Sequence, residues 1–397
     1  MIGYASARRS FGWIFALARL CVSFACMLGT TARHFLMCLS CFASCARARA
    51  RALPVPVFCA RGREQPAIFS LLQHLEVTEG VWYPVGGFQR IMNALASRVR
   101  ELGVTIDTDQ EVDHIIVDEA SKRAVGVVLS SGKVVDADVV VSNVDLPTAY
   151  SRMLPGREAA AQKLASLQFS SGVVAFYWSV RRCVDELAHH TTFISPGGEE
   201  AWDTVFAGHA QVPDEPSFYV CCPAKTDPSA APAGAESVMV LVPVGRFVCV
   251  VDDHASRLCI RTPCRCHILR CNTNRNTYAG CMPEDADVAD QYTLVAARAR
   301  AAVLERLKRV GVDLEGDIMH EVIYTPQEWR QRYGLFRGAA FGLAHPLSQL
   351  VIFRPPNRDN SVRNIYFVGA STTPGNGVPL VFTGARMCAE RIVAENA

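Results

Sequence analysis

The clearest pattern of apolar residues, glycines and prolines lies near the end of the chain, in residues 364–392. Ile365–Val368 is a short, continuously apolar run, which is typical of a buried parallel strand. Gly369, Gly375 and Gly377 then allow the backbone to turn sharply, and Pro379 suits the first turn of a helix. The helix would carry an apolar stripe made of Leu380, Ala385, Cys388, Ala389 and Ile392.

This pattern predicts a strand, a tight loop and a helix in direct succession. The N-terminus of a helix that glycines open is a suitable site for an anion, and a dinucleotide pyrophosphate is a common occupant. An ordinary strand-to-helix turn has the same spacing, so the pattern alone leaves both interpretations open.

A second patterned region precedes it in the chain. Apolar residues at helical spacing predict a helix from Gly87 to Gly103, followed by a short strand at Val104–Ile106. Three β runs come next, separated by polar turns. We expect them to form an antiparallel unit that returns to a parallel sheet. They are Glu111–Val117, Ala124–Leu129 and Lys133–Val141.

Residues 169–180 are apolar at both odd and even positions. A strand with two apolar faces fits a sheet that has core on one side and an apolar cavity on the other, where a long hydrocarbon could lie. Any buried central strand has the same pattern, so this alternative stays open. A further strand at Ser237–Val244 and an amphipathic helix over residues 288–311 complete the central region.

Composition limits the function classes. The formal net charge of +2 gives no nucleic-acid footprint, and 50% hydrophobic residues suffice for a large core in two domains. Of the 16 cysteines, six precede residue 60 and six lie in residues 249–281. The remaining four, Cys183, Cys221, Cys222 and Cys388, favour reduced, buried thiols over a disulfide framework.

Residues 1–62 differ from the rest of the chain. Residues 1–63 contain nine arginines and no Asp or Glu, a composition typical of an organelle-targeting segment. A non-native extension with GC-rich coding has the same composition, and both interpretations stay open. No G-x-G-x-x-G turn occurs in residues 1–62, and the first acidic residue is Glu64.

A second unusual segment, residues 249–283, interrupts the central region. Cys264, Cys266, Cys271 and His267 lack the paired C-x-x-C spacing of structural zinc sites. We therefore expect a disordered insert and no metal site.

Four stretches resemble one family in the family's own order. YFVGASTTPGNGVPLVFTGAR is similar to the C-terminal flavin-binding segment of the bacterial- and fungal-type phytoene desaturases, within the amine oxidase-like flavoproteins. Residues 79–95 resemble the crossing between that family's two domains, and residues 136–155 resemble its return from the flavin. Residues 336–359 resemble a strand pair before the C-terminal motif. The resemblance covers residues 63–246 and 284–397.

The resemblance implies an α/β fold, with a partial, Rossmann-like FAD-binding domain and a second mixed-sheet α+β substrate domain. The FAD-binding domain would comprise residues 63–150 and 331–397, and the substrate domain residues 151–330. Members of the family open with a glycine-rich pyrophosphate turn, which residues 1–62 do not supply. On this ground we expect this polypeptide to hold FAD weakly or not at all.

The resemblance also implies site residues. For the substrate they are His189 and His190, with solvated loop histidines as the alternative. The apolar pattern of residues 169–180, and not the resemblance, adds Phe176 and Trp178 as substrate contacts, with a buried central strand as the alternative. No catalytic residue is assigned. For FAD they are Val112, Asn143, Gly369, Ala370, Pro374, Gly375, Gly377, Val378 and Pro379.

The implied function is FAD-dependent desaturation of phytoene in carotenoid biosynthesis, an oxidation of CH–CH groups. A C40 polyene substrate implies peripheral membrane association, and the first segment would address an organelle such as the plastid. Two alternatives stay open. One is a carotene cis–trans isomerase or a retinol saturase-like flavoenzyme, and the other is an inactive fragment that cannot bind FAD.

Overall fold

The computed structural model describes residues 2–5, 78, 82–206, 210–246 and 285–396. Helices and strands both contribute to it, which confirms the predicted α/β class. The chain divides into two compact units, Met1–Ala161 with Phe341–Ala397 (unit 1) and Gln162–Ala340 (unit 2). The sequence predicts the corresponding boundaries after residues 150 and 330.

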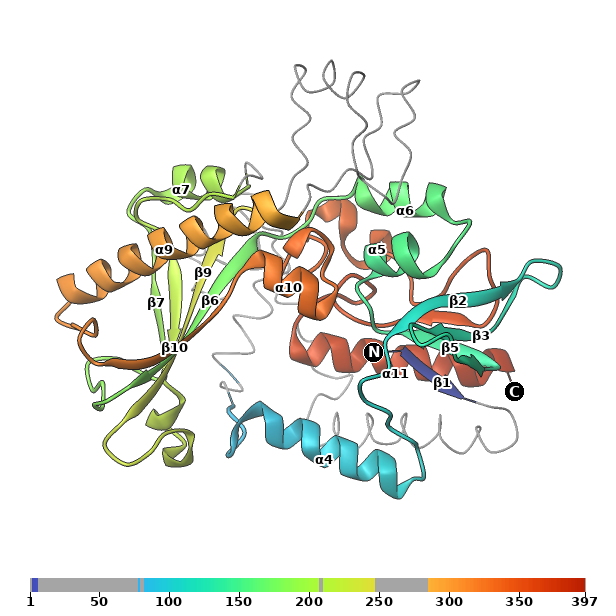
Figure 1. Cartoon of the computed structure of the whole chain (residues 1–397), viewed down its shortest axis with the longest axis horizontal. Coiled ribbons are helices and arrows are strands. Elements are labelled where there is room, and N and C mark those ends of the chain that lie inside the picture. The colour runs from blue at the N-terminus through green and yellow to red at the C-terminus, as the bar shows by residue number, and fades with distance from the viewer. Residues whose placement is uncertain (1, 6–77, 79–81, 207–209, 247–284, 397) are drawn as a thin grey trace, which may run out of the picture. The chain divides into compact units, whose positions relative to one another are not determined.

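Unit 1 contains two small sheets. Figure 1 labels β1 and β5 of the first sheet and β2 and β3 of the second. The first has the order β1-β5-β11 (Ile2–Ala5, Val139–Ser142, Ile365–Phe367). Strand β11 pairs with β5 in parallel, which confirms the buried parallel strand predicted at Ile365–Val368. The second sheet is antiparallel, with the order β2-β3-β4 (Val112–Asp118, Arg123–Leu129, Val134–Asp136). It corresponds to the predicted three-stranded unit.

Asn364 joins the two sheets of unit 1. Its side-chain amide donates to the backbone oxygens of Ala124 and Asp138, at 2.7 and 2.6 Å, and its oxygen accepts from the Ala124 N–H. The helix α11 (Val378–Asn396) covers the first sheet: Cys388 and Ile392 are buried against Tyr366 of β11. Leu380, at the start of the predicted apolar stripe, is instead exposed.

Three more helices belong to unit 1. The helix α4 (Gly87–Glu101) begins where the glycine pair predicts, and Gly103 follows it with a left-handed φ of +76°. Its apolar stripe is not buried. The others are the short α5 (Leu146–Thr148) and α6 (Glu158–Ala165), the latter ending across the unit boundary.

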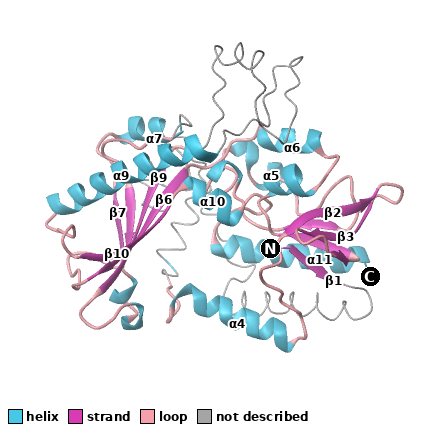
Figure 2. Ribbon diagram, in the orientation of Figure 1, coloured by secondary structure: helices cyan, strands magenta, loops and turns pink. Residues whose placement is uncertain are grey.

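Unit 2 is built on a five-stranded antiparallel sheet with the order β10-β6-β9-β8-β7, whose strands Figure 2 draws in magenta. The long helix α9 (Asp285–Arg309) packs on one face, and its side chains form the core of the unit with those of β6, β8 and β9. Two shorter helices complete it, α7 (Gly198–Phe206) and α10 (Pro326–Tyr333). The strands are β6 (Gly172–Val180), β7 (His190–Phe193), β8 (Phe218–Cys221), β9 (Glu236–Val244) and β10 (Ile318–Tyr324).

Two expected strands are wrong. Val104–Ile106 is not a strand but part of the connection between α4 and β2, and it pairs with no strand of the described sheets. Residues 336–359 contain no strand pair but a series of 3₁₀ turns. Pro346, Pro355 and Pro356 each lack an N–H to donate, which disfavours a regular ladder there.

The segment before the first domain contributes one strand. Ile2–Ala5 pairs antiparallel with β5, so these four residues belong to the sheet although they lie in the predicted extension. The insert at 249–283 lies outside the described residues. Of the four cysteines predicted as buried, Cys222 and Cys388 are buried, but Cys183 is exposed and Cys221 is half-buried. Among the described residues, no helix combines the length and the hydropathy needed to cross a bilayer.

Candidate functional site

The predicted glycine loop, residues 369–377, lies at the carboxyl ends of two parallel strands of unit 1. Val368 donates its N–H to the Ser142 oxygen at 3.0 Å, so the end of β11 lies beside the end of β5. A Cβ added to Gly369 would lie 3.6 Å from Oδ1 of Asn143. Ligands of open α/β sheets bind at this edge, beyond the carboxyl ends of the strands.

The backbone of the loop requires its glycines. Gly369, Gly375 and Gly377 have φ values of +124°, +137° and +102°, which side-chain-bearing residues rarely adopt. The helix α11 begins at Val378, so Pro379 lies in its first turn as predicted. The loop presents backbone N–H groups at a helix N-terminus, and this arrangement fits a phosphate group.

Arg354 supports this loop through hydrogen bonds to its backbone, and the sequence analysis does not predict this residue. Arg354 is buried, with 3% of the residue exposed, and its hydrogen bonds within the described residues all go to backbone oxygens. The guanidinium donates to Leu343, Ala344, Gln349, Ala370 and Thr372 at distances between 2.5 and 3.4 Å. Burial lowers the pKa of Arg354 to about 10. A single arginine within the apolar run VIFRPP is the signal that could have identified it.

Two further side chains support the loop. Burial lowers the pKa of His345 to about 3, so its imidazole is neutral at physiological pH. It lies under Gly375, where an added Cβ would come within 3.3 Å of Nε2. The hydroxyl of Ser371 donates to the carboxylate of Asp145, which follows β5. No sequence motif predicts these contacts, because they join residues far apart in the chain.

The structure brings most of the predicted cofactor residues together and leaves one apart. Val112 belongs to the separate β2-β3-β4 sheet, where it pairs with Leu129. The other eight lie at or after the ends of β5 and β11: Asn143, Gly369, Ala370, Pro374, Gly375, Gly377, Val378 and Pro379. Their contact with a cofactor stays a prediction.

In unit 2, the predicted substrate strand β6 has two different faces. Phe176 and Trp178 point into the core under α9, with 0% and 2% exposed. Tyr177, between them, lies on the opposite face and is 41% exposed. The accessible aromatic side chain of this strand is therefore Tyr177, and the two residues predicted to contact a substrate are core residues.

The face of the sheet opposite α9, called here the open face, carries an ordered row of side chains. Cross-strand pairing runs from His190 through Cys221, Met239 and Tyr177 to Val322. The next row includes Tyr219, Leu241 and Tyr324. The rings of Tyr177 and Tyr324 meet edge to face at 5.8 Å, and Tyr324 stacks on Trp329 at 5.0 Å. The middle of this face is apolar and aromatic without being fully buried, whereas its edges carry polar side chains such as His190 and His320.

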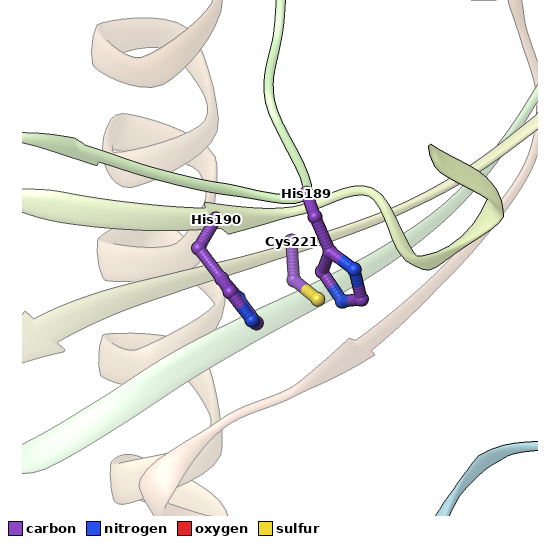
Figure 3. Close-up of side chains that lie close together, drawn as sticks. All are labelled: His189, His190 and Cys221. Atoms are coloured by element: carbon purple, nitrogen blue, oxygen red, sulfur yellow. The ribbon is translucent and has the colours of Figure 1, made fainter. Parts of the chain in front are cut away.

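The two predicted histidines lie at the β7 edge of the open face (Figure 3). Their ring centroids are 4.1 Å apart, and Figure 3 shows Cys221 beside them. Burial lowers the pKa of both imidazoles. His189 is half-buried and His190 is exposed, so the pair is accessible at least in part.

Comparison with known proteins identifies relatives. Residues 56–253 match the family described as flavin containing amine oxidoreductase. The chain is 35% identical to a phytoene desaturase of Fusarium fujikuroi, over 84% of this chain and 55% of that protein. It is 36% identical to a phytoene desaturase of Phycomyces blakesleeanus, over 83% of this chain and 51% of the relative. A zeta-carotene-forming phytoene desaturase of Myxococcus xanthus is 33% identical, over 83% of this chain and 56% of that protein.

The chain thus spans about half the length of the curated relatives it matches. Among solved structures, an oxidoreductase from Methanosarcina mazei superposes with a TM-score of 0.48 at 18% identity. That likeness covers 81% of this chain and 58% of the other.

Proposed function

Because the chain belongs to the flavin containing amine oxidoreductase family, we propose that it serves in the FAD-dependent desaturation of phytoene. The observation that carries this proposal is the agreement of several phytoene desaturases, from fungi and a bacterium, at 33–36% identity over more than four fifths of the chain. Carotenoid biosynthesis is the corresponding process.

The residues of unit 1 fit a flavin nucleotide. The glycine loop offers backbone N–H groups at the start of α11, and no Cβ blocks approach at Gly377, around which an added Cβ would find open space. Arg354 keeps the loop in place through hydrogen bonds to its backbone, and His345 lies under Gly375. Bound FAD would supply the hydride acceptor that no amino-acid side chain provides. The protein's part is to position the dinucleotide and to exclude water.

The open face of unit 2 supports a long hydrocarbon substrate. Its rows combine tyrosine rings with Met239 and Leu241, and offer no charged side chain at the positions next to Tyr177. A polyene carries no group that can accept a directed hydrogen bond, so recognition must depend on apolar area and on contacts with aromatic rings. We place the substrate on this face, with Tyr177 as its central contact.

Complementation in a carotenogenic host that lacks its own desaturase tests the function. We expect the protein, expressed at the full length of its relatives, to convert colourless phytoene to coloured carotenes in the presence of FAD. If it interconverts cis and trans carotenes without desaturating phytoene, the proposal is wrong and the isomerase alternative holds.

We also propose peripheral membrane association through one loop of unit 1. Four large apolar side chains lie within seven residues, and each is more than half exposed. Arg354 anchors the base of this loop, so the exposed residues are held at the surface by a rigid support. Burial of such side chains in lipid contributes about 1.5–3 kcal/mol each. They are Leu347, Val351, Ile352 and Phe353.

Co-sedimentation with liposomes tests this loop. The double variant Ile352→Asp/Phe353→Asp should lower the bound fraction at least tenfold. Leu294→Asp, at an apolar position on α9 that is also more than half exposed, serves as the control and should bind as the parent does. Equal binding of both variants would contradict the assignment of the loop.

The arginine-rich, acid-free residues 1–63 support a further proposal, that they direct the protein to an organelle, the plastid being the destination. A fluorescent protein fused behind residues 1–63 should then accumulate in plastids of a plastid-bearing cell. Fluorescence that stays in the cytosol, or enters mitochondria, would overturn this destination.

A further inference from the structure

A cluster of three potential metal ligands lies at the β7 edge of unit 2. The ligand atoms of His189, His190 and Cys221 all lie within 4.8 Å of one another. His190 and Cys221 are directly opposite each other on the neighbouring strands β7 and β8. Figure 3 shows the two rings and the sulfur converging on one region beside the sheet.

The local backbone explains how two successive histidines reach the same side. Side chains alternate between the faces of a regular strand, so neighbours would point apart. His189 precedes the first residue of β7 and lies outside the regular strand, although its oxygen still accepts from the Cys222 N–H at 2.8 Å. The rings therefore lie side by side, with centroids 4.1 Å apart.

Each imidazole also has an oxygen partner on Nδ1. In His189 this nitrogen lies 2.6 Å from Oγ1 of Thr226, and in His190 it lies 2.5 Å from the hydroxyl oxygen of Tyr219. When each Nδ1 carries the proton and donates it, the lone pair is on Nε2. Histidines that bind metals through Nε2 typically have such a partner on the other nitrogen, which fixes the ring.

The electrostatic surroundings favour a cation. Glu236 is buried, with 3% of the residue exposed, and its carboxylate interacts electrostatically with both His189 and Cys221. Lys225 lies 3.5 Å from that carboxylate and 2.9 Å from Asp185. Lys225 is thus shared between two carboxylates and offsets the charge of Glu236 only in part.

We propose that His189, His190 and Cys221 bind one late transition-metal dication, of which Zn²⁺ is the type, through two imidazole nitrogens and one thiolate. Imidazole and thiolate ligands select such ions over Mg²⁺ and Ca²⁺. On binding, the Cys221 thiol gives its proton to solvent and the sulfur forms the metal bond, so no oxidant is required. A water molecule would complete the tetrahedral geometry.

This site goes beyond the proposed desaturation and does not depend on it. A metal held by all three residues would tie the edge strand β7 to β8. Edge strands lack a partner on one side, so such a link would stabilise this border of the sheet.

Titration of the full chain with Co²⁺, under a phosphine reductant, tests the proposal, because Co²⁺ bound to thiolate gives a charge-transfer absorption in the near ultraviolet. The chain has 16 cysteines, so the measurement is a difference between variants. We expect Cys221→Ser and His190→Ala each to lose one equivalent of bound Co²⁺ relative to the parent. The cysteine variant should also lose the absorption of one thiolate ligand.

Two matched controls separate this site from other ligands. Cys183→Ser removes an exposed thiol of the same unit, and His320→Ala removes an exposed histidine on β10. Both should bind Co²⁺ as the parent does. Since His190 is exposed, its replacement leaves the fold intact even if the cysteine variant unfolds. If His190→Ala and Cys221→Ser both keep the parent's stoichiometry, the proposal is overturned.

Discussion

The glycine loop of unit 1 and the open face of unit 2 are built in different ways. The loop is held through its backbone: Arg354 contacts carbonyl oxygens, and three glycines provide the φ values that the path requires. The open face is made of side chains on a regular sheet, and the helix α9 on the other side determines which residues it contains. A loop of the first kind depends on a few special positions, whereas a face of the second kind depends on the whole sheet.

The largest effect should come from removing the support of the loop. Arg354→Leu leaves five carbonyl oxygens of buried backbone without their donor, and we expect the free energy of unfolding of unit 1 to fall by about 5 kcal/mol. Urea denaturation measures the loss. Arg358→Leu, which removes only a surface ion pair with Glu395, should cost about 1 kcal/mol or less. Similar losses for the two variants would contradict the role given to Arg354.

Two neighbouring residues of β6 test the difference between the faces of unit 2. Trp178→Ala removes a core side chain that donates to Glu321 at 2.5 Å, and it should cost about 4 kcal/mol of stability. Tyr177→Ala, on the open face, should cost about 1 kcal/mol but reduce phytoene turnover at least tenfold. Thermal unfolding and carotene yield measure the two effects. A Tyr177 variant with unchanged turnover would show that the open face is not the substrate surface.

The sequence predicts the loop more fully than it predicts the open face, because the loop depends on local residues and the face depends on a distant helix. In the loop, Gly369, Gly375 and Gly377 specify their own backbone angles, so the pattern of residues predicts the turn directly. In β6, alternation predicts the strand, but both faces are apolar. Only α9, more than 100 residues later, decides that Phe176 and Trp178 are core, and the alternation within β6 does not indicate which face the helix covers.

Long-range contacts account for the other misses. Arg354 contacts backbone oxygens within residues 343–372, and Asn364 contacts residues 124 and 138. No local motif therefore predicts the contacts of either side chain. The histidine pair was visible in the sequence, whereas its approach to Cys221 required the register between β7 and β8. The expected strand at Val104–Ile106 is wrong because a short apolar run alone does not specify a pairing partner, and this segment pairs with no strand of the described sheets.

A smaller effect concerns pH and the histidine under the loop. The pKa of His345 is lowered to about 3 by burial, so the unfolded chain takes up a proton below pH 6.5 that the folded chain does not. The contribution of this imidazole to stability is therefore fully present above this pH and is lost as the pH falls toward 3. From pH 7 to pH 5 this group should remove about 2 kcal/mol from the free energy of unfolding.

The measurement compares urea unfolding of the parent and of His345→Gln at the two pH values. The variant should lose this part of the pH dependence, whatever its stability at pH 7. His320→Gln, at an exposed position of unit 2, should keep the parent's dependence. Equal pH dependence in the parent and the His345 variant would show that the imidazole is not kept neutral by the fold.

The smallest effect separates backbone strain from crowding within the loop. Gly375→Ala and Gly377→Ala both force a side-chain-bearing residue to a strongly positive φ, which costs about 1–3 kcal/mol. Only at Gly375 does the new Cβ also meet a neighbour, Nε2 of His345 at 3.3 Å, whereas Gly377 has open space. Gly375→Ala should therefore be less stable than Gly377→Ala by about 1 kcal/mol. Differential scanning calorimetry of the pair measures this difference. Combining Gly375→Ala with His345→Ala should remove it, because the contact is then absent; a difference that persists in the double variant would assign the cost to the backbone alone.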